Sequence, residues 1–134
     1  MKFDSYMLGI DSLGLGELRL LEVDNRLVLP VSYYNRINIT SSDVIHSWFL
    51  PRYGFKLDAL PGIVNVHLVR FDRVGVFYGM CSEVCGAGHR YIPIVVEVVP
   101  GDVFLGWLED FKHKYDIVTR LGDWYKMHGV RSFV

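Results

Sequence analysis

Both cysteines of this chain lie in one short segment, CSEVCGAGH, which ends in a histidine. Thiolates and imidazoles are ligands that copper and zinc prefer, so Cys81, Cys85 and His89 form a candidate metal site. Two glycines between the second cysteine and the histidine allow the backbone to turn tightly enough to direct all three donors inward. A fourth donor should come from elsewhere. His46 is the best candidate, because an imidazole within an apolar strand pattern needs a polar partner.

Simpler interpretations of these residues stay open at this point. Cys81 and Cys85 could form a disulfide or pack as ordinary core thiols. Zinc is a further candidate, although structural zinc sites usually combine two close pairs of ligands. His46 considered alone is more often a hydrogen-bonded core histidine than a metal ligand.

Composition limits the class of protein. The chain of 134 residues has the length of one domain, is 51% hydrophobic and carries a net charge of −1. A nearly neutral chain lacks the basic surface with which proteins bind nucleic acid phosphates. No apolar run approaches the roughly 20 residues of a membrane-spanning helix, and the start MKFDSYML does not resemble a signal peptide.

Short β-type segments surround the cysteine loop and predict an all-β sandwich or barrel. After Gly101, apolar residues recur at helical spacing, which predicts one or two helices over 102–127 with a break at Gly122. Asp102 is expected to cap the first helix. The predicted strands are 18–23, 26–31, 35–40, 44–51, 63–71, 74–80 and 91–99.

Several strings together resemble cytochrome c oxidase subunit II. CSEVCGAGHRYIPIVVEVVP and SSDVIHSWFLPRYGFKLDALPG are similar to its two copper-ligand segments, and GVFYGMCSEVCG to the strand that leads into the copper loop. FDSYM and GELRLLEVDNRLVLP are similar to the start of its soluble domain. The resemblance covers residues 3–108. It implies a cupredoxin-like Greek-key β-barrel over 1–108, followed by a helical C-terminal extension over 109–134.

The resemblance also implies a dinuclear copper centre of the CuA type. Cys81 and Cys85 would bridge the two copper ions, and His46 and His89 would each bind one of them. The backbone carbonyl of Glu83 would be a weak copper ligand, and its side chain would help to bind magnesium at the border with subunit I.

The implied function is electron entry into the oxidase. Cytochrome c would reduce the copper centre, which would pass the electron to haem a in subunit I. The oxidase would lie in the mitochondrial inner membrane, with this domain facing the intermembrane space. Because cytochrome c is basic, docking should use acidic groups. Asp43, Asp58 and Asp24 are the candidates, and each also fits an ordinary solvated carboxylate.

The sequence departs from the family at one ligand position. The family has a methionine three residues after the loop histidine, where this chain has Ile92. Weak axial ligands tune the reduction potential more than they hold the metal, so we expect the centre to form with a raised potential. Ile92 could also reflect a mitochondrial codon translated as Ile instead of Met, or accompany a loss of copper binding.

The family also carries two membrane-spanning helices and an aromatic cluster before this domain. We expect either an excised or truncated domain, or a subunit whose membrane half is a separate chain. Among the remaining histidines, His67 is expected to be structural, and His113 and His128 have no evident partner donors. The competing functions are a copper-binding assembly or carrier module without redox turnover, and a structural β-domain with a disulfide.

Overall fold

The computed structural model describes residues 3–86 and 92–121, with side chains as far as residue 113. Strands followed by one helix make up this part of the chain, which confirms the expected β-rich fold with a helical C-terminal segment. The elements in chain order are η1 (Ile10–Ser12), β1 (Leu27–Pro30), β2 (Tyr34–Ile39), β3 (His46–Leu50), η2 (Pro51–Tyr53), β4 (Phe55–Ala59), β5 (Asn65–Arg70), β6 (Gly75–Cys81), β7 (Pro93–Val99) and α1 (Gly101–Leu121).

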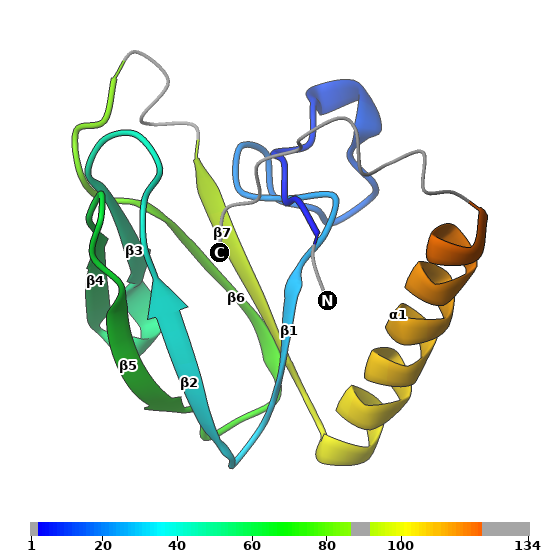
Figure 1. Ribbon diagram of the computed structural model, residues 1–134. Coiled ribbons are helices and arrows are strands. Elements are labelled where there is room, and N and C mark those ends of the chain that lie inside the picture. Colours follow the sequence, from blue (N-terminus) through cyan, green and yellow to red (C-terminus); the bar gives the residue numbers. More distant parts are fainter. Residues whose placement is uncertain (1–2, 87–91, 122–134) are drawn as a thin grey trace.

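The strands form two sheets that pack against each other (Figure 1). The larger sheet has the strand order β1-β7-β6-β3-β4, in which only β1 and β7 run parallel. Strands β2 and β5 form a separate antiparallel pair. Val69 of β5 lies in one buried cluster with Leu50 and Phe77 of the larger sheet, so the main core lies between the sheets.

Strand β7 (Pro93–Val99) is covered on both of its faces, which explains its nearly continuous apolar sequence. Val96 and Val98 are fully buried in the core between the sheets, while Val95 and Val99, on the opposite face of the strand, are buried as well. Figure 1 shows the N-terminal segment and α1 on the far side of β1 and β7 from the two-stranded sheet. A strand covered on both faces needs apolar residues at successive positions, which the sequence PIVVEVV supplies.

Helix α1 follows β7 directly and crosses residue 108, where the sequence suggested a domain boundary. Asp102 lies in the first turn and does not cap the helix. The carbonyl of Pro100 instead accepts the first helical hydrogen bond, from the backbone N–H of Phe104. A row of aromatic rings in contact, Phe104, Trp107 and Phe111, follows one side of the helix, and the ring of Phe3 contacts Phe111 in the middle of the helix. The predicted break at Gly122 lies outside the described residues.

The strand predictions differ from the structure at two places: one predicted strand is absent, and one strand was not predicted. Residues 18–22 form a turn, because the carbonyl of Leu18 accepts hydrogen bonds from the N–H groups of Leu21 and Glu22, and Leu20 has a positive φ of 67°. Only Val23 pairs as expected of a strand residue, in an isolated antiparallel bridge with Met7. Strand β4 was missed, although its sequence FKLDA alternates apolar and polar residues as a half-buried strand does.

A buried ion pair explains the turn. The Glu22 side chain is only 1% exposed, and it accepts hydrogen bonds from Nε and Nη2 of Arg26 at 3.0 and 3.1 Å and from the Tyr78 hydroxyl at 3.0 Å. Arg26 also reaches Glu97 on β7 at 3.2 Å. Burial alone would raise the pKa of Glu22, but these hydrogen bonds outweigh it and lower the pKa. Glu22 therefore fastens the N-terminal segment to β6 and β7.

Candidate metal centre

Pairing between β3 and β6 brings together residues that are far apart in sequence. Trp48 of β3 lies directly opposite Cys81 of β6 in the antiparallel register. His46 is two positions before Trp48 and so projects from the same face of the sheet. Gly79 permits this close pairing, because a Cβ atom at this position would lie 2.0 Å from the carbonyl oxygen of Phe49.

Three side chains that could bind a metal meet at the end of these strands. The Sγ atoms of Cys81 and Cys85 lie 3.8 Å apart, and Nδ1 of His46 lies 4.0 Å from Sγ of Cys81. All three donor atoms lie within 4.8 Å of one another. Cys81 and Cys85 are not joined by a disulfide in the structure, which was one of the alternatives that the sequence left open. Two thiolates and an imidazole at this spacing suit copper or zinc.

Hydrogen bonds favour ionisation of one thiol over the other. Burial raises the pKa of both groups, but for Cys81, which is 4% exposed, backbone and His46 hydrogen bonds outweigh it and lower the pKa. One of these is the backbone N–H of Ser47, 3.4 Å from the sulfur. The pKa of Cys85 is raised, first by burial and then by the neighbouring Cys81. Cys81 is therefore the sulfur that loses its proton first.

Ser47 also ties the cysteine loop to β3, a role that sequence reasoning missed. Its carbonyl accepts a hydrogen bond from the backbone N–H of Ser82 at 3.2 Å, and its hydroxyl oxygen accepts one from the Ser82 hydroxyl at 3.1 Å. The side chain is 1% exposed. No sequence signal distinguishes this serine from one on a solvated strand face, because the loop residues it holds, Cys81 and Ser82, lie 34 and 35 residues away.

The second ring nitrogen of His46 contacts Asp43. Nε2 lies 2.8 Å from Oδ1 of Asp43, while Nδ1 faces Cys81. Ser41 in turn donates its hydroxyl to the same carboxylate oxygen at 2.9 Å. The hydrogen bond to His46, followed by those to the Val44 backbone and to Ser41, lowers the pKa of Asp43 to about 2. Burial would lower the pKa of His46, but Asp43 and Cys81 together raise it.

The remaining predicted residues occupy different positions. The backbone carbonyl of Glu83 lies 3.5 Å from Sγ of Cys81, and the Glu83 carboxylate lies 3.7 Å from Nζ of Lys56. Asp58 also lies 3.7 Å from Lys56. Asp24 accepts a hydrogen bond from the backbone N–H of Tyr6 and thus holds the N-terminal segment.

Ile92 lies beside the cluster even though it brings no donor atom. Its carbonyl accepts a 3.0 Å hydrogen bond from the N–H of Cys81, and its side chain shares an apolar cavity of about 430 Å³ with His46 and Cys81. His89 and His128 lie outside the described residues. His67 is stacked on Phe55, with ring centroids 5.2 Å apart, away from the sulfur pair.

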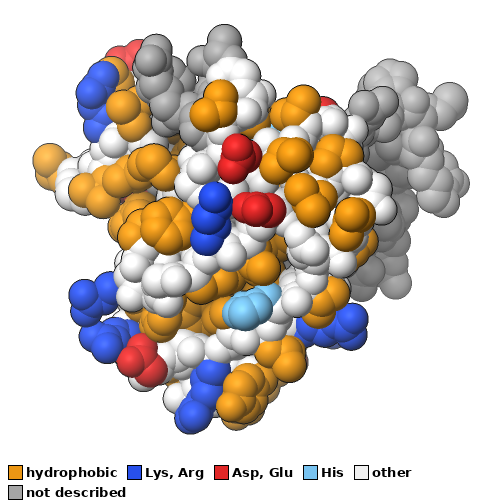
Figure 2. Space-filling model, turned by 90° about the vertical axis from the view of Figure 1, so that its left-hand side faces the viewer, with side chains coloured by type: hydrophobic (Ala, Val, Ile, Leu, Met, Phe, Trp, Pro, Cys, Tyr) orange, Lys and Arg blue, Asp and Glu red, His pale blue; other side chains and the backbone are white. Residues whose placement is uncertain are grey.

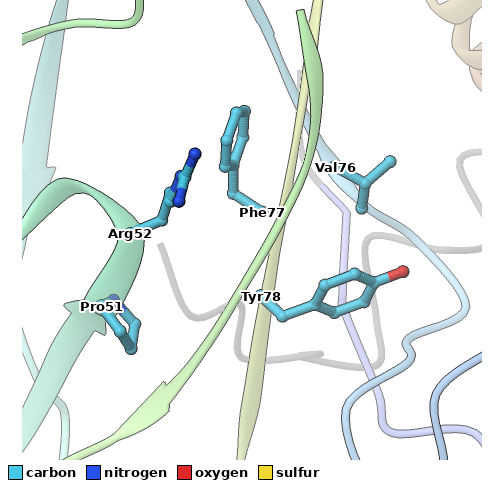
Figure 3. Close-up of a pocket in the computed structure, with 5 residues that line it drawn as sticks. All are labelled: Pro51, Arg52, Val76, Phe77 and Tyr78. Carbon is cyan, nitrogen blue, oxygen red and sulfur yellow. The ribbon is translucent and has the colours of Figure 1, made fainter.

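Two other surfaces of the described residues do not combine thiols with an imidazole. A hollow of about 600 Å³ between η2 and β6 is lined by Pro51, Arg52, Val76, Phe77 and Tyr78, with Tyr78 directed away from Arg52 (Figure 3). It contains no thiol or imidazole. Figure 2 shows many hydrophobic side chains on the face over β4 and β5. Among them, Val66 and Leu68 are exposed on β5. The donor cluster at the β3–β6 end therefore remains the candidate site.

Comparison with known proteins agrees with this geometry. The family model of the periplasmic domain of cytochrome c oxidase subunit II matches residues 1–99. The chain belongs to the subunit II family. Cytochrome c oxidase subunit 2 of Branchiostoma floridae is 54% identical over 109 residues, which are 81% of this chain and 47% of that protein. Subunit 2 of Phytophthora megasperma is 49% identical over 123 residues, 92% of this chain and 46% of that protein. This subunit II chain thus spans about half the length of the curated relatives it matches.

Solved structures of the subunit II family confirm the cupredoxin-like fold. The periplasmic domain of subunit II from Bradyrhizobium japonicum has a TM-score of 0.75 and 43% identity, over 84% of this chain and 78% of that one. A mixed disulfide intermediate between a thioredoxin-like protein and subunit II of cytochrome c oxidase has a TM-score of 0.70 and 41% identity, over 84% and 75% of the two chains. Within residues 3–86 and 92–121, no helix has the length and apolar character that crossing a membrane requires.

Proposed function

We propose that this subunit II domain is the electron-entry module of a cytochrome c oxidase. The observation that carries the proposal is the convergence of Cys81, Cys85 and His46 within 4.8 Å in a protein of this family. His89, from the same loop, is proposed as the second imidazole, and the Glu83 carbonyl as a weak ligand. A pair of copper ions held there would supply a one-electron redox couple.

The surrounding residues suit rapid electron exchange. His46 and Cys81 belong to paired strands, and Ser47 fastens the loop that carries Cys85, so the donors are held in place before any metal binds. A fixed donor set changes little between oxidation states. The cavity beside Cys81 is lined mostly by apolar side chains, and the hydrophobic surroundings of a metal site influence its reduction potential.

The wider assignments are part of the same proposal. Cytochrome c would be the electron donor, and haem a in subunit I would be the acceptor. The domain would face the intermembrane space of mitochondria. Helices of the whole subunit, or of a separate chain, would attach it to the inner membrane. Asp58, 49% exposed, is available for docking a basic partner. The Glu83 carboxylate, 42% exposed, is available for magnesium at the subunit I border if it releases Lys56. Relatives named as cytochrome c oxidase subunit 2, and a heme-copper terminal oxidase dimer that is 30% identical over 55% of this chain, support this placement.

Copper reconstitution tests the proposal directly. Reduced, metal-free protein is loaded with copper and examined by metal analysis and EPR spectroscopy. Two coppers per chain, with a delocalised seven-line EPR pattern and strong visible absorption, are expected. One copper or none would contradict the electron-entry function. A Cys85→Ser variant serves as the control, because it keeps one sulfur and should lose the seven-line pattern.

A metal-carrier function is the alternative. Carriers need exposed thiols that release the metal readily, whereas Cys81 is almost fully buried. The two functions differ in exchange rate: an electron-transfer site should retain copper against a chelator, and a carrier should release it within the time of mixing.

The mixed disulfide formed by a relative leads us to propose that a thioredoxin-like reductant also acts on this cysteine pair before copper enters. In that step the dithiol of the reductant becomes a disulfide, and the Cys81–Cys85 disulfide becomes two thiols.

A further inference from the structure

Asp43 was expected to dock cytochrome c, but its carboxylate faces a metal-binding residue. Oδ1 lies 2.8 Å from Nε2 of His46, and the other ring nitrogen, Nδ1, lies 4.0 Å from Sγ of Cys81. A neutral imidazole has one N–H donor and one lone pair. With the carboxylate accepting the Nε2–H hydrogen bond, the lone pair lies on Nδ1 and faces the sulfur pair, which is the orientation that a metal ligand needs.

The carboxylate is itself held in place. The buried hydroxyl of Ser41 lies 2.9 Å from Oδ1 of Asp43 and 2.5 Å from the Val44 carbonyl, and the backbone N–H of Asp43 donates to the Ser41 oxygen at 3.3 Å. Ser41 also forms a bridge with Pro61 after strand β4. The chain of contacts therefore runs from the β-scaffold through Ser41 and Asp43 to His46, and it fixes the ring from the side opposite Cys81.

We propose that Asp43 is a positioning residue for the metal centre: its carboxylate fixes the orientation and the protonated nitrogen of His46, and so presents Nδ1 to copper. This inference rests on the proposed function, and it assigns Asp43 a role different from docking. A carboxylate that bonds the outer nitrogen of a ligating histidine typically contributes 10- to 100-fold to metal affinity.

Three variants separate positioning from charge. Asp43→Ala removes the acceptor, Asp43→Asn keeps an acceptor oxygen but removes the charge, and Asp58→Asn removes a similarly exposed charge that pairs with Lys56 and does not contact His46. We expect Asp43→Ala to weaken copper binding by about 10- to 100-fold in competition with a copper(I) chelator. Asp43→Asn should restore part of this loss, and Asp58→Asn should match the wild type.

Two further measurements make the result specific. Thermal unfolding of the metal-free variants shows whether Asp43→Ala has merely lost folded protein. NMR of the His46 ring in metal-free protein is expected to show one fixed ring orientation in the wild type and Asp43→Asn, and averaging between orientations in Asp43→Ala. Electron-nuclear double resonance of the copper-loaded protein should show an altered coupling to Nδ1 of His46 only in the Asp43 variants.

The outcomes separate this inference from the proposed function. If the wild type binds no copper pair, the electron-entry function fails, while the metal-free NMR comparison still decides whether Asp43 fixes the ring. A ring equally ordered in Asp43→Ala, or copper affinities equal in all variants, would overturn the positioning role. If Asp43→Ala and Asp43→Asn both weaken cytochrome c binding as Asp58→Asn does and leave the His46 signals unchanged, Asp43 is a docking residue instead.

Discussion

Gly79 lies where strands β3 and β6 approach most closely, and replacing it tests whether this pairing builds the metal centre. A Cβ atom added at Gly79 would lie 2.0 Å from the carbonyl oxygen of Phe49 and 3.0 Å from Cδ2 of Leu50. The first contact is with backbone, which cannot turn aside as a flexible side chain does. In Gly79→Ala, the two strands must therefore separate by about 1 Å, since unstrained Cβ contacts lie beyond about 3 Å.

The expected cost follows from this contact. Overpacking a core typically destabilises a protein by 1–3 kcal/mol, and a clash with backbone belongs at the upper end. Part of this cost, about 0.4–1 kcal/mol, is offset because alanine lowers the conformational entropy of the unfolded chain relative to glycine. We therefore expect Gly79→Ala to reduce the free energy of unfolding by about 2–3 kcal/mol, which lowers the melting temperature by roughly 10 °C in a domain of this size.

The assay is thermal and urea unfolding of metal-free protein, together with copper uptake. Because Cys81 is two residues beyond Gly79 on β6, separation of the strands should also increase its distance from His46 and weaken copper binding. Gly106→Ala is the matched control: Gly106 is exposed on α1 with nothing within 4 Å of its Cβ position, and alanine there should stabilise the helix by up to about 1 kcal/mol. Unchanged unfolding and copper binding in Gly79→Ala would refute the reasoning.

Three more predictions concern the ion pair and the missing ligand. Glu22→Ala should lower the free energy of unfolding by about 3 kcal/mol, because it leaves the Tyr78 hydroxyl without its acceptor and Arg26 with Glu97 alone; chemical denaturation measures this, and a change below 1 kcal/mol would contradict it. The folded state lowers the pKa of Glu22 from its ordinary value of 4.5, so its stabilising contribution is complete above pH 4.5 and disappears as the pH falls through the lower folded-state pKa. In Glu22→Gln, the free energy of unfolding should depend less on pH below pH 4.5 than in the wild type. An equal dependence in the two proteins would show that Glu22 does not cause it. Ile92→Met should lower the midpoint reduction potential of the copper-loaded protein, because a thioether donor is restored, and equal potentials would exclude the tuning role.

The amino-acid sequence by itself determined the chemistry available to this protein. The thiols of Cys81 and Cys85 and the imidazole of His46 were recognised from residue type and local pattern, and the structure brings these three donors together. Most strands and the helix were also predicted, because alternation of apolar residues is a local property. The metal-binding roles of these residues, and of His89 in particular, stay predictions.

Only the tertiary structure decided how the donors are held. His46 and Cys81 are 35 residues apart, and their contact depends on the register of β3 against β6, which no local pattern encodes. The same is true of Glu22, whose buried ion pair turns an apolar stretch away from strand structure. Asp43 has the sequence context of a solvated surface acid, and only the folded chain directs its carboxylate to the imidazole. The sequence specifies which chemical groups are present, and the folding of the chain determines which atoms these groups contact.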